Sequence, residues 1–196
     1  MKRAIFSFLL LIPVFSFGQK LDGCWGLKFY AGQAHVKSEI SSKTGRDPET
    51  KSNENLLYYK DCEFAGRHAQ EILLLFFNDS LYGMEVVFVP GKEPDILNLY
   101  SNIKDELVRK YWFPQLEAER YEYPFEKGDK YYLTAIQGGY VTIGSIWYFP
   151  RQGKENVDGE IMLNVKDTLR IKLTYRDGLL SKRILEMIEK EKESDY

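Results

Sequence analysis

The chain has 196 residues, with 27 Lys and Arg against 29 Asp and Glu, and a formal net charge of −2. Basic and acidic residues are interspersed without a basic stripe, so the sequence lacks the electrostatic basis of nucleic-acid binding. A chain of this length can bury one substantial core, and its sequence contains no motif that indicates a catalytic centre or a cofactor.

The first 18 residues predict a signal peptide that is removed on export. Lys2 and Arg3 give a positive start, an apolar stretch follows through residue 17, and small residues precede the expected cleavage before Gln19. The apolar stretch is about 13 residues long, shorter than the roughly 20 that a transmembrane helix needs, so we expect no membrane span. The expected domains are a signal peptide at 1–18 and a single α+β domain at 19–196, in the periplasm or secreted.

Two cysteines, Cys24 and Cys62, predict a disulfide, because their number is even and an exported protein meets an oxidising compartment. The bond would enclose about 38 residues and stabilise the fold by roughly 3 to 4 kcal/mol in the chain-entropy model. The alternative is a lipoprotein anchored through Cys24, because Leu21-Asp22-Gly23-Cys24 resembles a bacterial lipobox. The two interpretations exclude each other.

The N-terminal half predicts a short strand, a helix and a three-stranded meander. The short strand is expected at 26–30, and the helix spans 33–44 and ends at Gly45. A polar loop follows to residue 55. Strands are then expected at 56–64, 71–77 and 81–89.

The strand at 71–77 is apolar on both faces, because Ile72 to Phe77 are all large hydrophobic residues. This pattern is typical of a central strand that is covered on both sides. It also fits a strand with one side buried in a subunit interface. A homodimer that forms through the sheet is therefore one expected partner arrangement.

A long amphipathic helix is the clearest element of the second half. Pro94 marks its start, and the apolar residues from Ile96 to Tyr111 keep the spacing of a helix face that ends near Trp112. An irregular segment is expected at 113–130, and Gly138-Gly139 predicts a hairpin turn. Strands are expected at 131–136, 140–149, 160–165 and 169–175, followed by a C-terminal helix from Leu180.

These patterns predict an α+β fold of antiparallel β-meanders with amphipathic helices packed on one face. The tripeptide Asp79-Ser80-Leu81 recurs as Asp167-Thr168-Leu169, each time between apolar strands, which suggests two related β-meander-plus-helix halves. Both tripeptides also match a pattern that some bacteria O-glycosylate on exported proteins, with Ser80 and Thr168 as acceptors. Turn chemistry explains them equally well.

No catalytic residues are predicted. His35 and Glu39 lie four apart and His68 and Glu71 three apart, but clustered metal-ligand spacing is missing, so no metal site is predicted. Cys62 and His68 could form a nucleophile–base dyad, which the predicted disulfide disfavours. Spacing neither identifies nor excludes a carboxylate pair, so a hydrolase that acts on envelope or extracellular polymers stays an alternative.

Aromatic residues in and beside the irregular segment are the strongest functional candidates. Exposed rings bury a large area on binding at a small entropic cost, and long loops in compact domains are often functional. The alternative is that these rings hold the loop against the domain. The candidate partner-binding residues are Trp112, Phe113, Tyr121, Tyr123 and Phe125.

From Gly26 onward, the order of predicted elements and the sequence Gly26-Leu27-Lys28-Phe29 resemble a group of small secreted bacterial proteins of unknown function. That group opens with Gly-Ile-x-Phe-Gly and a Ser or Thr helix cap, whereas this chain continues Tyr30-Ala31-Gly32-Gln33. The resemblance implies export and an α+β fold, and no known activity. We therefore expect an exported, non-enzymatic module that binds a protein or a glycan.

Overall fold

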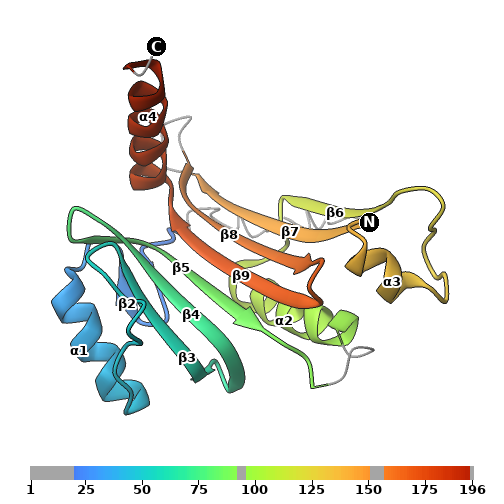
Figure 1. Cartoon of the computed structure of the whole chain (residues 1–196), viewed down its shortest axis with the longest axis horizontal. Coiled ribbons are helices and arrows are strands. Elements are labelled where there is room, and N and C mark those ends of the chain that lie inside the picture. The colour runs from blue at the N-terminus through green and yellow to red at the C-terminus, as the bar shows by residue number, and fades with distance from the viewer. Residues whose placement is uncertain (1–19, 92–95, 151–156, 195–196) are drawn as a thin grey trace, which may run out of the picture.

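A seven-stranded antiparallel sheet organises the residues that the structure, a computed structural model, describes: 20–91, 96–150 and 157–194 (Figure 1). Its strands lie in the order β3-β4-β5-β9-β8-β7-β6. The predicted signal peptide and Pro94 lie outside the described residues. Together with the helices of the described residues, this sheet confirms the predicted α+β fold.

Two three-stranded meanders meet in the middle of this sheet, where β5 of the first pairs with β9 of the second. The first comprises β3 (Leu56–Phe64), β4 (Arg67–Phe77) and β5 (Ser80–Phe88). The second comprises β7 (Val141–Pro150), β8 (Val157–Lys166) and β9 (Arg170–Asp177), with β6 (Leu116–Tyr121) added at the outer edge of β7. A helix follows each meander, α2 (Ile96–Tyr111) and α4 (Gly178–Ser194).

The recurring tripeptides occupy turns of different length. Asn78 and Asp79 form a two-residue turn between paired Phe77 and Ser80, and both have positive φ, 47° and 57°. Asp167-Thr168-Leu169 forms a three-residue turn in which Leu169 takes the positive φ, 52°. Because Asp and Asn favour such turns, turn chemistry explains the recurrence. Glycosylation of Ser80 and Thr168 stays a prediction.

One face of the sheet carries the core. Alternate residues of the two central strands point to this face and are buried, among them Val86 in β5 and Leu173 in β9. The helix α2 lies over this face and contacts β8 and β9 (Figure 1), and each aliphatic side chain that it buries contributes roughly 1.5 to 3 kcal/mol. Its buried residues are Ile96, Tyr100, Ile103 and Leu107.

The helix α1 (Gln33–Thr44) packs against β3, at one edge of the sheet. Its Val36 and Ile40 are fully buried, and Gly45 ends it with a left-handed φ of 66°. A glycine at this position relieves the steric cost of that conformation, so the predicted bounds are confirmed. Before α1, the expected strand at 26–30 is instead a small hairpin of β1 (Gly23–Cys24) and β2 (Leu27–Lys28).

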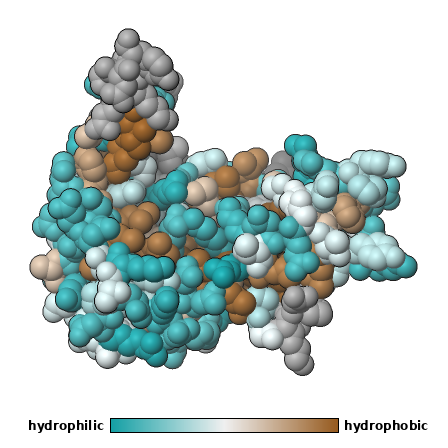
Figure 2. All heavy atoms as spheres, viewed as in Figure 1, coloured by the Kyte–Doolittle hydropathy of each residue, from teal (hydrophilic) through white to brown (hydrophobic). Residues whose placement is uncertain are grey.

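The helix α4 continues directly from β9 and stands away from the sheet (Figure 1). Its first turn is anchored by the buried Leu180, whereas Leu185 and Ile188 are exposed further along. Figure 2 shows a brown patch on the projecting helix. Within the described ranges, none of the helices combines the length and the apolar character needed to cross a bilayer.

The second face of the sheet is mixed in character. In β4, Ile72 and Leu74 are buried on the core face, whereas Leu73 and Leu75 are half-buried on the other. Ion pairs cross the middle of this second face, joining Glu85 to Lys172 and Arg176, and Arg176 to Glu160. The strand β4 is therefore not equally covered on its two sides, and the alternative of a homodimer through the sheet stays a prediction.

Two further elements differ from the sequence-based expectation. Residues 131–136 were expected to be a strand, but α3 (Tyr132–Gln137) is a short helix that ends at Gly138, and Gly139 (φ 75°) follows it instead of a hairpin. Its Ala135 and Ile136 are buried, and the helix contacts β7 and β8, so tertiary packing overrides the β propensity of this segment. The expected irregular segment contains the edge strand β6.

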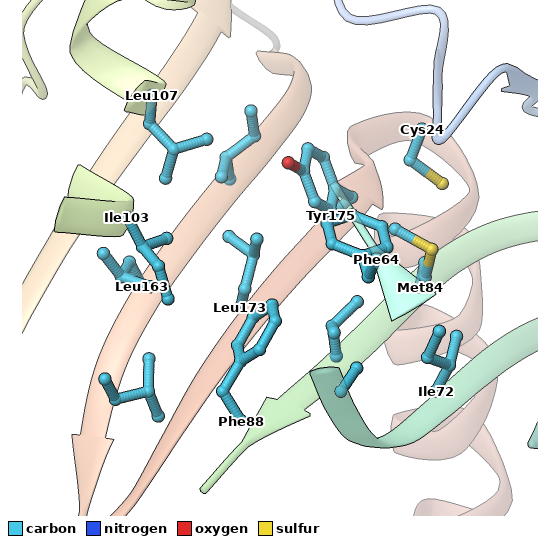
Figure 3. Packing of buried hydrophobic residues seen from close by; sticks show 14 of the residues in the cluster. Cys24, Phe64, Ile72, Met84, Phe88, Ile103, Leu107, Leu163, Leu173 and Tyr175 are labelled. Atoms are coloured by element: carbon cyan, nitrogen blue, oxygen red, sulfur yellow. The ribbon is translucent and has the colours of Figure 1, made fainter. Parts of the chain in front are cut away.

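The predicted disulfide is wrong, because Cys24 and Cys62 are both free and buried. The two thiols lie in different surroundings. Cys24, in β1, lies near Tyr175 (Figure 3), and burial raises the pKa of its thiol to about 12 against an opposing effect of Lys110. Cys62, in β3, donates a hydrogen bond of 3.4 Å to the Lys60 carbonyl. Each cysteine therefore packs as a small apolar side chain.

Candidate functional site

The five predicted partner-binding residues do not form one site, because β6 separates them. Trp112 and Phe113 precede β6, Tyr121 is its last residue, and Tyr123 and Phe125 follow it. At about 3.4 Å per residue, the six residues of β6 place the two groups roughly 17 Å apart. Trp112, Phe113 and Tyr123 are exposed, at 61%, 59% and 95%.

Tyr121 and Phe125 are half-buried against the core, so these two rings hold the segment to the domain. The Phe125 ring lies 5.3 Å from the Tyr140 ring, and the Tyr121 hydroxyl donates to the Glu119 carboxylate at 3.1 Å. Lys127 also donates to Glu119, at 2.6 Å. The contacts of Tyr121 and Phe125 therefore fit the alternative role, in which the rings hold the loop against the domain.

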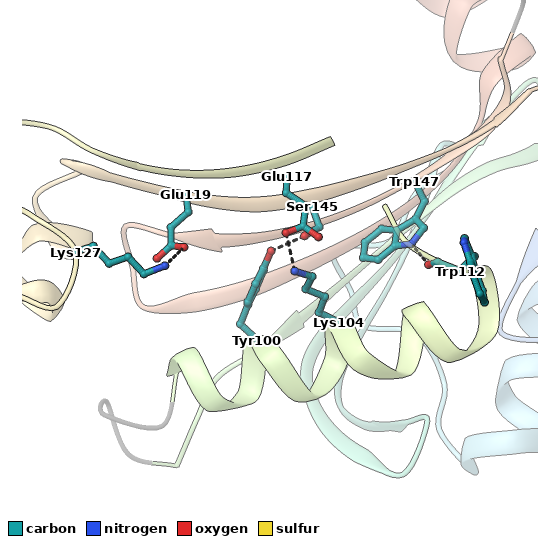
Figure 4. A network of polar contacts seen from close by, with 8 residues as sticks. All are labelled: Tyr100, Lys104, Trp112, Glu117, Glu119, Lys127, Ser145 and Trp147. Carbon is teal, nitrogen blue, oxygen red and sulfur yellow. Dashed lines mark hydrogen bonds and ion pairs between the residues drawn. The ribbon is translucent and has the colours of Figure 1, made fainter. Parts of the chain in front are cut away.

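Trp112 and Phe113 form the other group, at the end of α2. The Trp112 N–H donates to the Val108 carbonyl at 2.9 Å, and Trp112 itself has a left-handed φ of 69°. Its carbonyl accepts a hydrogen bond of 2.9 Å from the indole N–H of the buried Trp147, and its own ring lies beyond that carbonyl (Figure 4). The Trp112 and Phe113 rings meet edge to face at 5.4 Å. The backbone that carries both rings is therefore held in place by a hydrogen bond from a buried side chain.

We call Trp112, Phe113 and Leu116 the aromatic corner. Leu116, the first residue of β6, is 50% exposed and pairs with Ile146 of β7. The backbone of Gln115 is bound to the same strand, because its N–H donates to the Ile146 carbonyl at 2.9 Å. The aromatic corner is thus a continuous piece of chain that presents three apolar side chains at the edge of the sheet.

The edge of β6 continues from the aromatic corner. The Glu122 N–H donates to the Tyr140 carbonyl, so in the antiparallel register the even-numbered residues face β7 and the backbone groups of Glu117 and Glu119 point outward. Lys104 of α2 donates to Glu117 at 2.8 Å and supports the strand from below (Figure 4). The opposite edge of the sheet, β3, differs. There the Tyr58 carbonyl accepts a hydrogen bond from the Glu49 N–H, and the Tyr58 N–H donates one to the Ser52 hydroxyl, both in the preceding loop.

A cleft on the core face of the sheet was not predicted. It has a volume of about 210 Å³ and lies between α2, the central strands and the turn at Trp25. Its residues come from one helix, four strands and two turns, so no local pattern in the sequence marks it. The alternation of Ile171, Leu173 and Tyr175 in β9 predicts a buried strand face, but it does not predict a cleft in that face. The cleft is lined in part by Phe64, Phe88, Ile103, Leu107, Leu173 and Tyr175.

The two histidines lie in separate ion pairs. The His35 imidazole lies 3.6 Å from Glu39 on α1, and His68 lies 3.5 Å from Asp61, while Glu71 pairs with Arg170. Within the described ranges, no three potential ligands of a metal ion come together.

Cys62 and His68 lie on opposite faces of the β3–β4 ribbon. Cys62 pairs with Ala69, and both are buried, whereas His68 pairs with Glu63, and both are exposed. Because successive residues of a strand alternate between faces, the two side chains point apart. Burial also raises the pKa of the Cys62 thiol, which disfavours the reactive thiolate.

No protein-family model, curated protein or solved structure matches this chain. The resemblance to small secreted bacterial proteins therefore stays a prediction, and the function is argued from the geometry.

Proposed function

We propose that this protein is an exported module that binds a partner protein through its aromatic corner. The observation that carries the proposal is the exposure of two large rings, 61% for Trp112 and 59% for Phe113, on a backbone held by the buried Trp147. Export rests on the predicted signal peptide at 1–18. The expected location is the periplasm or the cell exterior.

Burial of the aromatic corner against a partner would release a substantial free energy. An aromatic side chain buries roughly 150 to 250 Å² in all, so covering the exposed part of one ring is worth about 3 kcal/mol at 25 cal/mol per Å². The cost of ordering the binding surface is small here, because the Trp147 hydrogen bond and the pairing of Gln115 already fix the backbone. Such fixed aromatic anchors are typical of interface hot spots.

A protein partner fits the corner better than a glycan. The edge-to-face arrangement of Trp112 and Phe113 presents no broad flat surface for a sugar ring, and Leu116 extends the patch with an aliphatic side chain. The outward backbone groups of β6 begin at the next residue, Glu117, and could bond an extended segment of a partner. Both features suit a polypeptide that packs apolar side chains against the aromatic corner and pairs its backbone with β6.

The rival interpretation, a hydrolase of envelope or extracellular polymers, has weaker support. The nucleophile–base pair weighed from the sequence, Cys62 and His68, is divided between opposite faces of a ribbon. We therefore rank binding first. A turnover screen on glycans and peptides tests the rival directly, and activity lost on substitution of an acidic or histidine side chain would reverse the ranking.

The binding proposal is tested with a photo-crosslinking amino acid at Phe113 in the full chain, expressed in its natural host. The crosslinked partner is identified by mass spectrometry, and its affinity is then measured with purified protein. Trp112→Gly should weaken binding by about tenfold or more, while the positive φ at this position suits glycine. Tyr123→Ser is the matched control, because it removes a still more exposed ring from the far end of β6.

Equal affinity for the parent protein and Trp112→Gly would contradict the proposal. A loss that appears only with Tyr123→Ser would move the binding site to the other end of β6. If the corner instead retains purified oligosaccharides, and Trp112→Gly abolishes this retention, the glycan interpretation replaces the protein one.

A further inference from the structure

The outer part of α4 exposes apolar side chains to solvent. Leu185, Met187 and Ile188 are 60%, 45% and 42% exposed, and every residue from Leu185 to Lys190 is exposed. The helix makes its main contacts with β8 and β9, and its outer part stands away from the sheet (Figure 1). These side chains therefore lack a cover within the described part of the chain.

The exposed side chains continue a row that begins in the core. Leu180 is buried, Ile184 is half-buried and Ile188 is exposed, and their spacing of four places them along one side of the helix. The apolar stripe of a helix normally faces a core, and a short helix without such packing is only marginally stable in water. These features indicate that another surface covers the outer half of the stripe.

Charged residues border this stripe differently on its two sides. At 3.6 residues per turn, Lys182 and Glu189 lie two turns apart on the border next to Leu185. Arg183 and Lys190 lie on the opposite border. The first border thus carries one charge of each sign, at its two ends, whereas the second carries positive charges. A helix with the same first border, running in the opposite direction, would complement it.

The apolar residues and the charges require the same register. If Ile184 of one helix lies level with Ile188 of an antiparallel copy, Lys182 lies only about 1.5 Å along the axis from the level of Glu189 in that copy. Two-fold symmetry makes this contact twice, whereas a parallel pair would place like charges side by side. Lys182 lies 3.8 Å from Glu186 of its own helix, and such an exposed pair contributes little.

We propose that a second copy of this chain covers the stripe, so that two α4 helices pack antiparallel through Leu185 and Ile188 and pair Lys182 with Glu189. A membrane surface fits less well, because interfacial helices are rich in basic residues, whereas three basic and two acidic residues lie between positions 182 and 190. The contact is small beside the roughly 800 Å² per partner of a stable dimer. We therefore expect a reversible dimer whose formation depends on concentration.

The test is sedimentation velocity of the full chain, produced in its natural host, from about 10 µM to 1 mM, the range of a weak interface. Leu185→Ser should raise the dissociation constant of the dimer about tenfold or more. Lys182→Glu should also raise it, because two glutamates then oppose each other at each end. The double variant Lys182→Glu with Glu189→Lys should recover the parent affinity, since it exchanges the two charges.

Two controls separate this interface from other effects. Lys190→Glu reverses an exposed charge on the opposite border, and Lys190 lies four residues from Glu186, as Lys182 does, so it should leave the dissociation constant unchanged. Leu73→Thr tests the alternative of a homodimer through the sheet, and it should also have no effect. Leu185→Ser should keep the parent melting temperature at low concentration, because its side chain is mostly exposed.

Four outcomes would overturn the proposal. The first is a protein that stays monomeric up to about 1 mM. The second is a dimer that Leu185→Ser does not weaken, or that only Leu73→Thr weakens. The third is a double charge variant that associates no better than Lys182→Glu. The fourth is a monomer that binds phosphatidylcholine–phosphatidylglycerol vesicles and loses this binding in Leu185→Ser, which would assign the stripe to a lipid surface.

Discussion

Tyr100 of α2 and Ser145 of β7, 45 positions apart in the chain, share a buried hydroxyl–hydroxyl hydrogen bond of 2.7 Å (Figure 4). Ser145 is completely buried, and burial raises the pKa of Tyr100 while its bond to Ser145 opposes this. The bond joins the helix over the core to the strand that supports β6. It therefore contributes to holding the open edge of the sheet in place.

Removing both partners of this pair should lower the free energy of unfolding by less than the two single removals added together. Tyr100→Phe leaves the Ser145 hydroxyl buried without its partner, and Ser145→Ala does the same to Tyr100, so each should lower the free energy of unfolding by about 1 to 3 kcal/mol. The double variant should lose clearly less than the sum of the two. Urea denaturation of all four proteins measures this, and strictly additive losses would show that the bond is not formed in solution.

Asp177 is the last residue of β9 and directly precedes α4, and one of its carboxylate oxygens accepts two hydrogen bonds. The Leu180 N–H donates to it at 2.8 Å and the Tyr30 hydroxyl at 3.0 Å. Asp177→Ala should cost about 1 to 2 kcal/mol and loosen the first turn of α4, which hydrogen exchange would detect. Asp177→Asn keeps an oxygen acceptor and should lose much less. Equal exchange in the two variants would argue against this cap.

The Glu106–Arg67 pair predicts a pH dependence of stability. Hydrogen bonds from Arg67 hold the pKa of Glu106 below its ordinary value of 4.5, against the opposing effect of burial. A lowered pKa in the folded state stabilises the protein above the unfolded value, and this stabilisation is lost as the pH falls through the folded value. The Glu106 side chain is 41% exposed, so solvent screening limits the contribution to about 1 kcal/mol or less.

Glu106→Gln should accordingly be less stable than the parent at pH 7, and the difference should shrink as the pH falls below 4.5. Urea denaturation at pH 7, 5, 4 and 3 follows this difference. Glu186→Gln is the control, because Glu186 is more exposed and lies 3.8 Å from Lys182. A difference that stays constant down to pH 3 would exclude a titrating role of Glu106.

Elements with a strong local pattern could be predicted from the sequence, and elements that depend on distant partners could not. The helix α1 has buried residues four apart and a glycine stop, so its bounds follow from local rules. The strand β6 reads Leu-Glu-Ala-Glu-Arg-Tyr and is mostly exposed on both faces, so it shows no hydrophobic alternation, and pairing with β7 alone makes it a strand. The helix α3 was missed because buried contacts decide it.

The same distinction applies to the sites. Exposed rings in Trp112 and Phe113 could be anticipated, because they follow an amphipathic helix in a segment without an apolar pattern. Their separation from Tyr123 could not, since it depends on β6. The cleft was beyond sequence reasoning, because Trp25, Phe88 and Tyr175 are brought together only by the sheet order.

The free thiols predict low reactivity in the folded protein. Burial raises the pKa of Cys24 to about 12 and also raises that of Cys62, so little thiolate forms near neutral pH. Iodoacetamide should therefore leave the folded protein unmodified and alkylate both cysteines in urea, as intact mass would show. Reductant should not change the melting temperature. An intact mass two hydrogen atoms below that of the protein with free thiols would show that a disulfide forms. An added acyl mass on Cys24 would support the lipid anchor.

The left-handed conformation of Trp112 predicts an unusual order of stability for two variants. A side chain with a Cβ atom costs about 1 kcal/mol at positive φ, whereas glycine adopts this conformation freely and is the preferred residue just beyond a helix end. Trp112→Gly should therefore be more stable than Trp112→Ala by about 1 kcal/mol, although both lose the ring. Chemical denaturation of the two variants measures the difference.

Phe113 supplies the control for this comparison, because its φ is not positive. There the order should reverse, with Phe113→Gly less stable than Phe113→Ala, since glycine loses more conformational freedom on folding. If Trp112→Ala proved as stable as Trp112→Gly, residue 112 would not be held at positive φ in solution. The fixed presentation of its ring, on which binding at the aromatic corner depends, would then lose its structural basis.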